Sequence, residues 1–273
     1  MFRKTAFAFL FITVLTGLCL AGGFFEPELI VNGTLQEMRR LNENGQLLMQ
    51  RTYNRKGFMI CEENFWDGNS VGRSDFKVNG KGLVLSESYF DGNGDMYSGV
   101  AYSYVGGNLD SLEYQDGNGE ITGYSMMEYS GGVKTREVGY SADGSIRNVR
   151  DFTYDANGNL TQIDTYNIEG EGVFEINADV LVLYESIACE YNAAGQMIKE
   201  IYSYNGSVGT IIEYAYDNNG NVSGYAEKSP SGEVYMQMEY EYTYDEMSNV
   251  TKMVTKFVSD DFEESAFFEY VYK

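Results

Sequence analysis

The stretch YAYDNNGNVS (residues 214–223) decides the fold, because its residues favour the reversal of an extended chain. Tyrosine and valine favour strands. Asp217 can accept hydrogen bonds from the backbone two residues on, and Asn219-Gly220 can supply the two positive-φ residues of a type I′ turn. Similar units are FTYDANGNLT (152–161) and YTYDEMSNVT (242–251), so the sequence predicts β-hairpins at all three places.

Turn glycines recur with a nearly constant spacing. The successive intervals are 25, 25, 26, 25 and 25 residues, at Gly94, Gly119, Gly144, Gly170, Gly195 and Gly220. Further glycines near the half-period reduce the structural unit to about 12 residues, one strand plus one turn. We therefore expect an all-β chain of tandem antiparallel hairpin repeats, with about 18–20 strands forming a twisted meander or spiral sheet.

The repeated units also resemble the YD units of RHS-repeat proteins. The match is best in the middle and C-terminal parts, whereas residues 60–88 match loosely. The resemblance implies a long spiralling β-sheet. Asn159 and Asn221 stand where the family often has arginine, Ser248 replaces the last turn glycine, and no core-protease or toxin segment is visible. These departures leave it in doubt whether the sheet encloses a toxin as RHS shells do.

The first 23 residues have the layout of a secretory signal peptide. A basic start at Arg3-Lys4 precedes an apolar run and then small residues at Ala21-Gly22-Gly23. We expect residues 1–23 to be a leader and residues 24–273 to be one β-hairpin repeat domain, secreted or in the cell envelope with no membrane span after cleavage. A lipoprotein anchored through Cys19 is a weaker alternative.

The balance of acidic and basic residues limits the classes of molecule that can bind. The formal net charge is −22, and loss of Arg3 and Lys4 with the leader leaves 17 basic and 41 acidic residues, a charge of −24. Nucleic acid is therefore excluded as a partner, since its binding depends on Lys and Arg. Cations, basic proteins and neutral glycans remain.

The chain has no histidine. The usual general base is therefore missing, and we expect no enzyme and no cofactor. A hydrolase based on two carboxylates is less favoured, because adjacent acids such as Glu62-Glu63 point to opposite faces of a strand.

Aromatic residues are the candidate ligand contacts. Tyrosines alternate with other residues, so they form rows on one face of the sheet. Such rings can stack on sugars, but a packed ladder of cross-strand aromatic pairs is the favoured interpretation. The candidates are Trp66, Tyr102, Tyr104, Tyr214 and Tyr216.

Calcium is a possible ligand of the turns. Asp91 and Asp95 in DGNGD occupy the first and fifth positions of a calcium-loop pattern, but its closing glutamate is absent and turn formation already explains both residues.

Cys61 and Cys189 lie far apart in the sequence, so we expect two separate buried thiols rather than a disulfide.

The sequence thus predicts an exported, non-enzymatic binding or structural module for a carbohydrate or protein partner at the cell surface. The alternative is an immunity or antitoxin-like protein whose acidic surface neutralises a basic secreted toxin.

Overall fold

The computed structural model describes residues 27–272 except 28, 171, 178 and 259–261, so the expected leader lies outside the described residues. The described residues form 18 strands and no helix. The strands are β1 (Leu35–Asn42), β2 (Leu47–Tyr53), β3 (Met59–Trp66), β4 (Asn69–Val78), β5 (Val84–Asp91), β6 (Met96–Val105), β7 (Asn108–Asp116), β8 (Ile121–Ser130), β9 (Val133–Ser141), β10 (Ile146–Tyr154), β11 (Leu160–Ile168), β12 (Leu181–Tyr191), β13 (Met197–Tyr204), β14 (Ser207–Tyr216), β15 (Val222–Lys228), β16 (Val234–Tyr244), β17 (Val250–Phe257) and β18 (Phe262–Tyr272).

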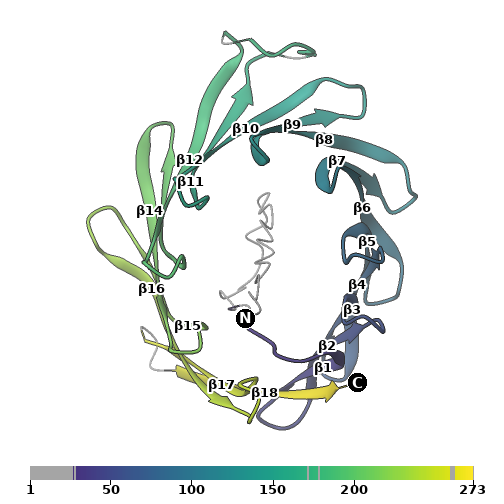
Figure 1. Ribbon diagram of the computed structural model, residues 1–273, viewed down its shortest axis with the longest axis vertical. Coiled ribbons are helices and arrows are strands. Elements are labelled where there is room, and N and C mark those ends of the chain that lie inside the picture. Colours follow the sequence, from purple (N-terminus) through teal and green to yellow (C-terminus); the bar gives the residue numbers. More distant parts are fainter. Residues whose placement is uncertain (1–26, 28, 171, 178, 259–261, 273) are drawn as a thin grey trace.

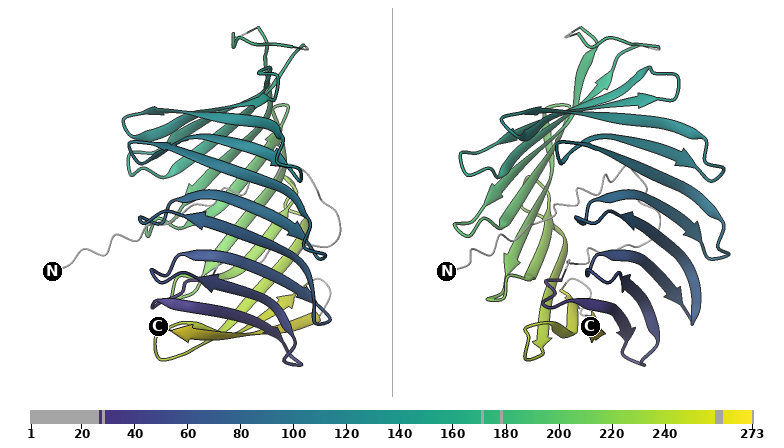
Figure 2. Two further views of the ribbon diagram at one scale, coloured as in Figure 1. Left: turned by 90° about the vertical axis from the view of Figure 1, so that its right-hand side faces the viewer. Right: turned by 45° about the vertical axis from the view of Figure 1, so that its right-hand side comes forward.

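The sheet closes on itself. Each strand pairs antiparallel with the next, and β1 also pairs with β18, where Met38 lies opposite Tyr270 and Arg39 opposite Glu269. Figure 1 shows the resulting ring, and Figure 2 shows the strands running obliquely around its wall. A barrel of this strand number is wide enough to leave a channel, and closure leaves no free sheet edge.

The expected twisted meander or spiral sheet is therefore wrong: the fold is a closed 18-stranded antiparallel β-barrel. A hairpin repeat determines how each strand meets the next. It does not determine whether the first strand meets the last, because that contact depends on the twist and stagger accumulated around the whole sheet.

The hairpins use two kinds of turn. Asn205-Gly206 has positive φ at both residues (49° and 79°), as a type I′ turn requires. In the unit at 217–221 only Gly220 has positive φ, the Gly220 N–H donates to the Asp217 carbonyl, and Asp217 Oδ1 accepts the N–H groups of Asn219 and Asn221. The prediction of a type I′ turn at Asn219-Gly220 is therefore wrong, because the aspartate cap favours a longer turn with a glycine bulge.

The two faces of the wall differ in chemistry. Cross-strand register places Tyr242, Met253 and Ala266 on one face. The other face carries Lys256, whose Nζ lies 2.5 Å from Glu241 Oε1 and 3.8 Å from Glu263 Oε1. On β16 to β18 the first face is therefore rich in tyrosine and methionine, and the second is charged and ion-paired.

The tyrosine-rich face lines the lumen. Residues 29–34, which we call the inner segment, lie inside the ring just before β1 (Figure 1). Leu29 in this segment packs against the cluster that contains Met238, Tyr240 and Phe268. The face that carries Lys256 is consequently the outer face.

One long loop covers part of the outer face. The connection between β11 and β12 brings Val173 and Ile176 against Val138, Ile146 and Val149, and the Ile146 N–H donates to the Val173 carbonyl at 2.7 Å. The loop thereby buries an apolar patch of β9 and β10. Among the described residues there is no helix of the length and hydrophobicity needed to cross a membrane.

Candidate functional site

A series of tyrosines lines the lumen near one end of the barrel. In each case an even-numbered strand ends beside the start of the preceding strand, and the tyrosine hydroxyl donates to the carbonyl of a residue there. The pairs are Tyr104 with Val84, Tyr129 with Leu109, Tyr191 with Leu160, Tyr216 with Met197, Tyr242 with Val222, and Tyr270 with Val250. These bonds fix the rings, and burial raises the pKa of Tyr191 to about 12, so its hydroxyl stays protonated.

Glutamates within the strands, Glu87 and Glu200, accept hydrogen bonds from lumenal tyrosines. Glu87 accepts from Tyr89 and, at 2.8 Å, from Tyr102. Glu200 accepts from Tyr214 at 2.6 Å, and burial raises the pKa of this carboxyl group. Sequence reasoning missed both residues. The signal for Glu200 was present, since it shares the alternation of Tyr202 and Tyr204 on β13.

Two asparagines in equivalent turns hold the inner segment. Asn221 Oδ1 accepts the N–H of Ile30 at 3.1 Å, and Asn249 Oδ1 accepts the N–H of Asn32. Asn249 Nδ2 also donates to the Asn32 carbonyl at 3.1 Å. Both asparagine side chains are buried, with exposures of 1% and 0%. The barrel therefore holds an extended polypeptide on its lumenal face through main-chain hydrogen bonds.

The candidate ligand-binding residues do not gather in one place. Tyr102 and Tyr104 lie on β6 and Tyr214 and Tyr216 on β14, on different parts of the wall (Figure 1). All four hydroxyls already donate within the barrel. Trp66 ends β3 and is 75% exposed. Their role in ligand binding stays a prediction.

Asp91 and Asp95 belong to one turn. Asp91 Oδ1 accepts the N–H groups of Asn93 and Asp95, each at 2.9 Å, and these backbone hydrogen bonds lower the pKa of Asp91. In the described residues no group of three or more Cys, Asp or Glu side chains is placed to hold a metal ion. Calcium at these aspartates stays a prediction.

Among the described residues Cys61 and Cys189 form no disulfide, as expected, but only Cys189 is buried and Cys61 is partly exposed. Register places Cys61 opposite Asp75 on the outer face, whereas Cys189 lies opposite Glu200 on the lumenal face. Burial raises the pKa of each thiol to about 11.

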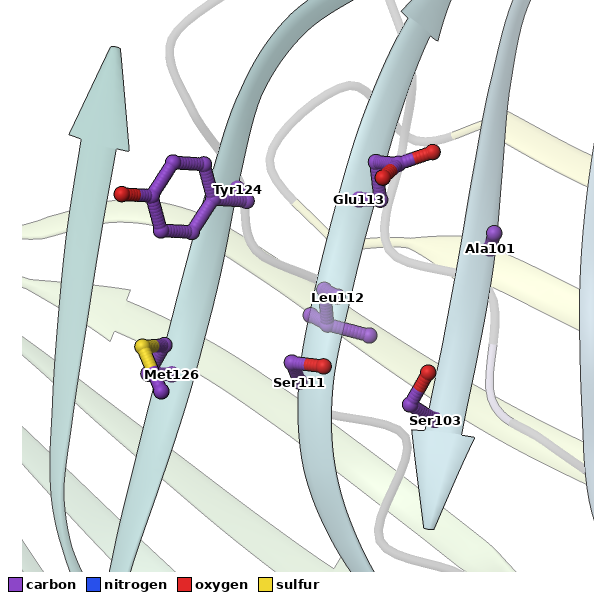
Figure 3. Close-up of a pocket in the computed structure, with 7 residues that line it drawn as sticks. All are labelled: Ala101, Ser103, Ser111, Leu112, Glu113, Tyr124 and Met126. Carbon is purple, nitrogen blue, oxygen red and sulfur yellow. The ribbon is translucent and has the colours of Figure 1, made fainter. Parts of the chain in front are cut away.

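A shallow hollow lies on the outer face of β6, β7 and β8. It encloses about 340 Å³ and is lined by Ala101, Ser103, Ser111, Leu112, Glu113, Tyr124 and Met126. Figure 3 shows these residues with strands of the opposite wall behind them. Sequence reasoning did not single out any of these residues, because a hollow made by short side chains on three neighbouring strands leaves no local motif.

The comparisons with known proteins give no family. No family model and no curated protein matches the chain, so the RHS/YD resemblance stays a prediction. Among solved structures, a porin-like protein from Bacteroides uniformis has a TM-score of 0.43 at 11% identity, covering 86% of this chain and 97% of that one. A porin-like protein from Bacteroides vulgatus has a TM-score of 0.41 at 11% identity, with coverages of 86% and 98%. The TcdB2-TccC3 complex has a TM-score of 0.30 at 14% identity, and the match covers 84% of this chain and 15% of that one. These scores do not establish a shared function.

Proposed function

We propose that this chain is an exported, non-enzymatic binding protein whose barrel encloses an extended polypeptide partner. The observation that carries the proposal is the inner segment, held on the lumenal face by Asn221 and Asn249. Hydrogen bonds to main-chain groups do not depend on the side chains of the bound peptide, so such a surface suits partners of varied sequence.

The tyrosine lining supports the same proposal. Because hydroxyls such as those of Tyr104 and Tyr216 are already used by the wall, a bound chain meets mainly ring faces and edges. Tyrosine rings offer large contact areas at a low cost in conformational entropy. The lumen can therefore hold apolar and polar stretches of a polypeptide.

The outer face supports a barrel surrounded by water. Ion pairs join successive strands there, including Arg136 with Asp151 at 2.6 Å and Lys228 with Glu213 at 2.5 Å. A lipid-facing wall instead presents an apolar band, and a cation at the bilayer midplane costs about 2–4 kcal/mol.

The test is site-directed photo-crosslinking to a fluorescein-labelled polypeptide that has been reduced and alkylated so that it stays unfolded. In a protein with Cys61 and Cys189 replaced by serine, a benzophenone maleimide is attached at Thr165→Cys on the lumenal face. The matched control is Thr243→Cys on the outer face. Register supports the choice, since Thr165 lies opposite Glu185, which lies opposite lumenal Tyr204, whereas Thr243 lies opposite Lys252.

We expect crosslinks from position 165 and few from position 243. Crosslinks from position 243 alone, or no binding of the polypeptide, would contradict the proposal.

A glycan is the second candidate partner, and the observation that favours it is the exposed indole of Trp66. Neutral oligosaccharides such as maltoheptaose and cellohexaose are the probes. Binding that is lost in Trp66→Ala supports this candidate, and the absence of binding removes it.

A further inference from the structure

The part of the wall formed by β5 to β8 carries no basic residue. Lys81 and Lys134 are consecutive basic residues in the sequence, and eight acidic residues lie between them. These are Glu87, Asp91, Asp95, Asp110, Glu113, Asp116, Glu120 and Glu128. Charges of one sign reinforce each other, so this part of the wall attracts cationic partners.

The outer hollow lies within this acidic region. Short side chains at Ala101, Ser103 and Ser111 form its floor, and the larger side chains of Tyr124 and Met126 stand at its edge (Figure 3). Register places Glu113 directly opposite both Ala101 and Tyr124. The hollow therefore combines a floor of small side chains, two of which carry hydroxyl groups, with an aromatic ring and a carboxylate.

The aromatic ring and the carboxylate are both held in place. Tyr124 stacks on Tyr140 of β9, with ring centroids 4.7 Å apart and an interplanar angle of 13°. Glu113 Oε1 accepts a hydrogen bond from Gln115 Nε2 at 3.1 Å. In the described part of the chain no ion pair includes Glu113, whereas Glu213 and Glu241 on other strands each pair with a lysine.

We infer that this hollow is the docking site for an arginine or lysine side chain from a basic segment of a partner protein. The alkyl stem of that side chain packs against Ala101 and Met126, and the small side chains of Ser103 and Ser111 leave room for it. Its cationic group lies beside the Tyr124 ring and pairs with Glu113. Arginine fits better than lysine, because its planar group can stack on the ring and bind the carboxylate through two N–H groups.

Apolar surface around the hollow favours a polypeptide over a small free cation. Met126 is 47% exposed and Ile121 is 48% exposed, and register places Ile121 opposite Gln115 on the same face. Apolar residues that flank the inserted cation in a partner protein can cover these side chains, whereas a free polyamine leaves them in water. This site is independent of the lumen and of what the lumen holds.

The test is a titration of the full barrel with a fluorescein-labelled peptide in which arginines alternate with leucines. Glu113→Gln removes the carboxylate, and Ser103→Phe fills the hollow at an exposed strand position without a change in charge. Glu239→Gln is the matched control, because it removes the same charge from the outer face of β16, on the opposite side of the ring (Figure 1). Circular dichroism confirms that each variant is folded.

We expect Glu113→Gln and Ser103→Phe each to weaken binding about tenfold, and Glu239→Gln to leave it unchanged. The inference is overturned if the peptide does not bind, or if Glu239→Gln weakens binding as much as Glu113→Gln, since net charge alone then explains the attraction. It is also overturned if Ser103→Phe has no effect, or if spermidine binds as tightly as the peptide.

Discussion

Asn249 binds Asn32 through both main-chain groups, since its Oδ1 accepts the N–H of Asn32 and its Nδ2 donates to the Asn32 carbonyl. One buried amide side chain thus replaces the pair of hydrogen bonds that a neighbouring strand would supply. Nδ2 of Asn249 also donates to the Tyr272 hydroxyl, which joins the inner segment to the last strand.

Replacement of Asn249 by alanine should destabilise the barrel. The change leaves the main-chain groups of Asn32 without these partners, which costs about 1–3 kcal/mol if they stay buried. Urea denaturation measures the loss. Asn159→Ala is the matched control, since Asn159 holds the same position in its turn and, among the described residues, its Nδ2 donates to Asp155 alone. Equal losses of unfolding free energy in the two variants would show that the contacts of Asn249 with the inner segment do not stabilise the barrel.

Ser248 should be replaceable by glycine with a gain in stability. Ser248 has a φ of +63° at the place where the related units have Gly158 and Gly220. A left-handed conformation costs an L-residue about 1 kcal/mol relative to glycine, so Ser248→Gly should raise the free energy of unfolding by about that amount. Gly158→Ser, where open space surrounds the added side chain, should lower it similarly. Thermal unfolding of both variants measures whether each one gains or loses stability. A destabilised Ser248→Gly variant would contradict the turn assignment.

Glu200→Gln should stabilise the barrel near neutral pH. Because burial raises the pKa of Glu200, folding disfavours the ionised form, and this group costs stability as the pH rises above about 4.3, its value in the unfolded chain. The neutral amide keeps an acceptor for Tyr214 and removes the penalty. We expect a gain of about 1 kcal/mol or less at pH 7 that disappears below pH 4, measured by denaturation at both pH values. A gain of the same size at both would show that the carboxyl charge plays no part.

Both native thiols should react slowly with iodoacetamide at pH 7.5. Their pKa values of about 11 leave very little thiolate, and reactivity should rise with pH. Ser103→Cys on the exposed outer face is the control, and it should react much faster. Mass spectrometry after timed labelling gives the three rates. A fast reaction at Cys189, which is buried, would contradict its place on the lumenal wall.

The strands and their connections could be predicted from the sequence, but the closure of the sheet into a barrel could not. Tyrosine alternation and the glycine spacing located the reversals, because those signals act over a few residues. Closure depends on Met38 meeting Tyr270, residues at opposite ends of the chain, and no short pattern encodes that contact. The hydrogen bonds of Asn221 and Asn249 to the inner segment could not be predicted either, because turn formation alone explains the presence of both asparagines.

Closure of the wall is the claim on which the lumen and its partner depend, and a disulfide across the β1–β18 seam tests it most directly. Arg39 and Glu269 lie opposite each other there on the outer face. In a protein with Cys61 and Cys189 replaced by serine, mild oxidation of Arg39→Cys/Glu269→Cys should give an intramolecular disulfide in monomeric protein, detected by mass spectrometry of peptides without reduction. Oxidation that yields only linked dimers or free thiols would show that the two end strands do not meet.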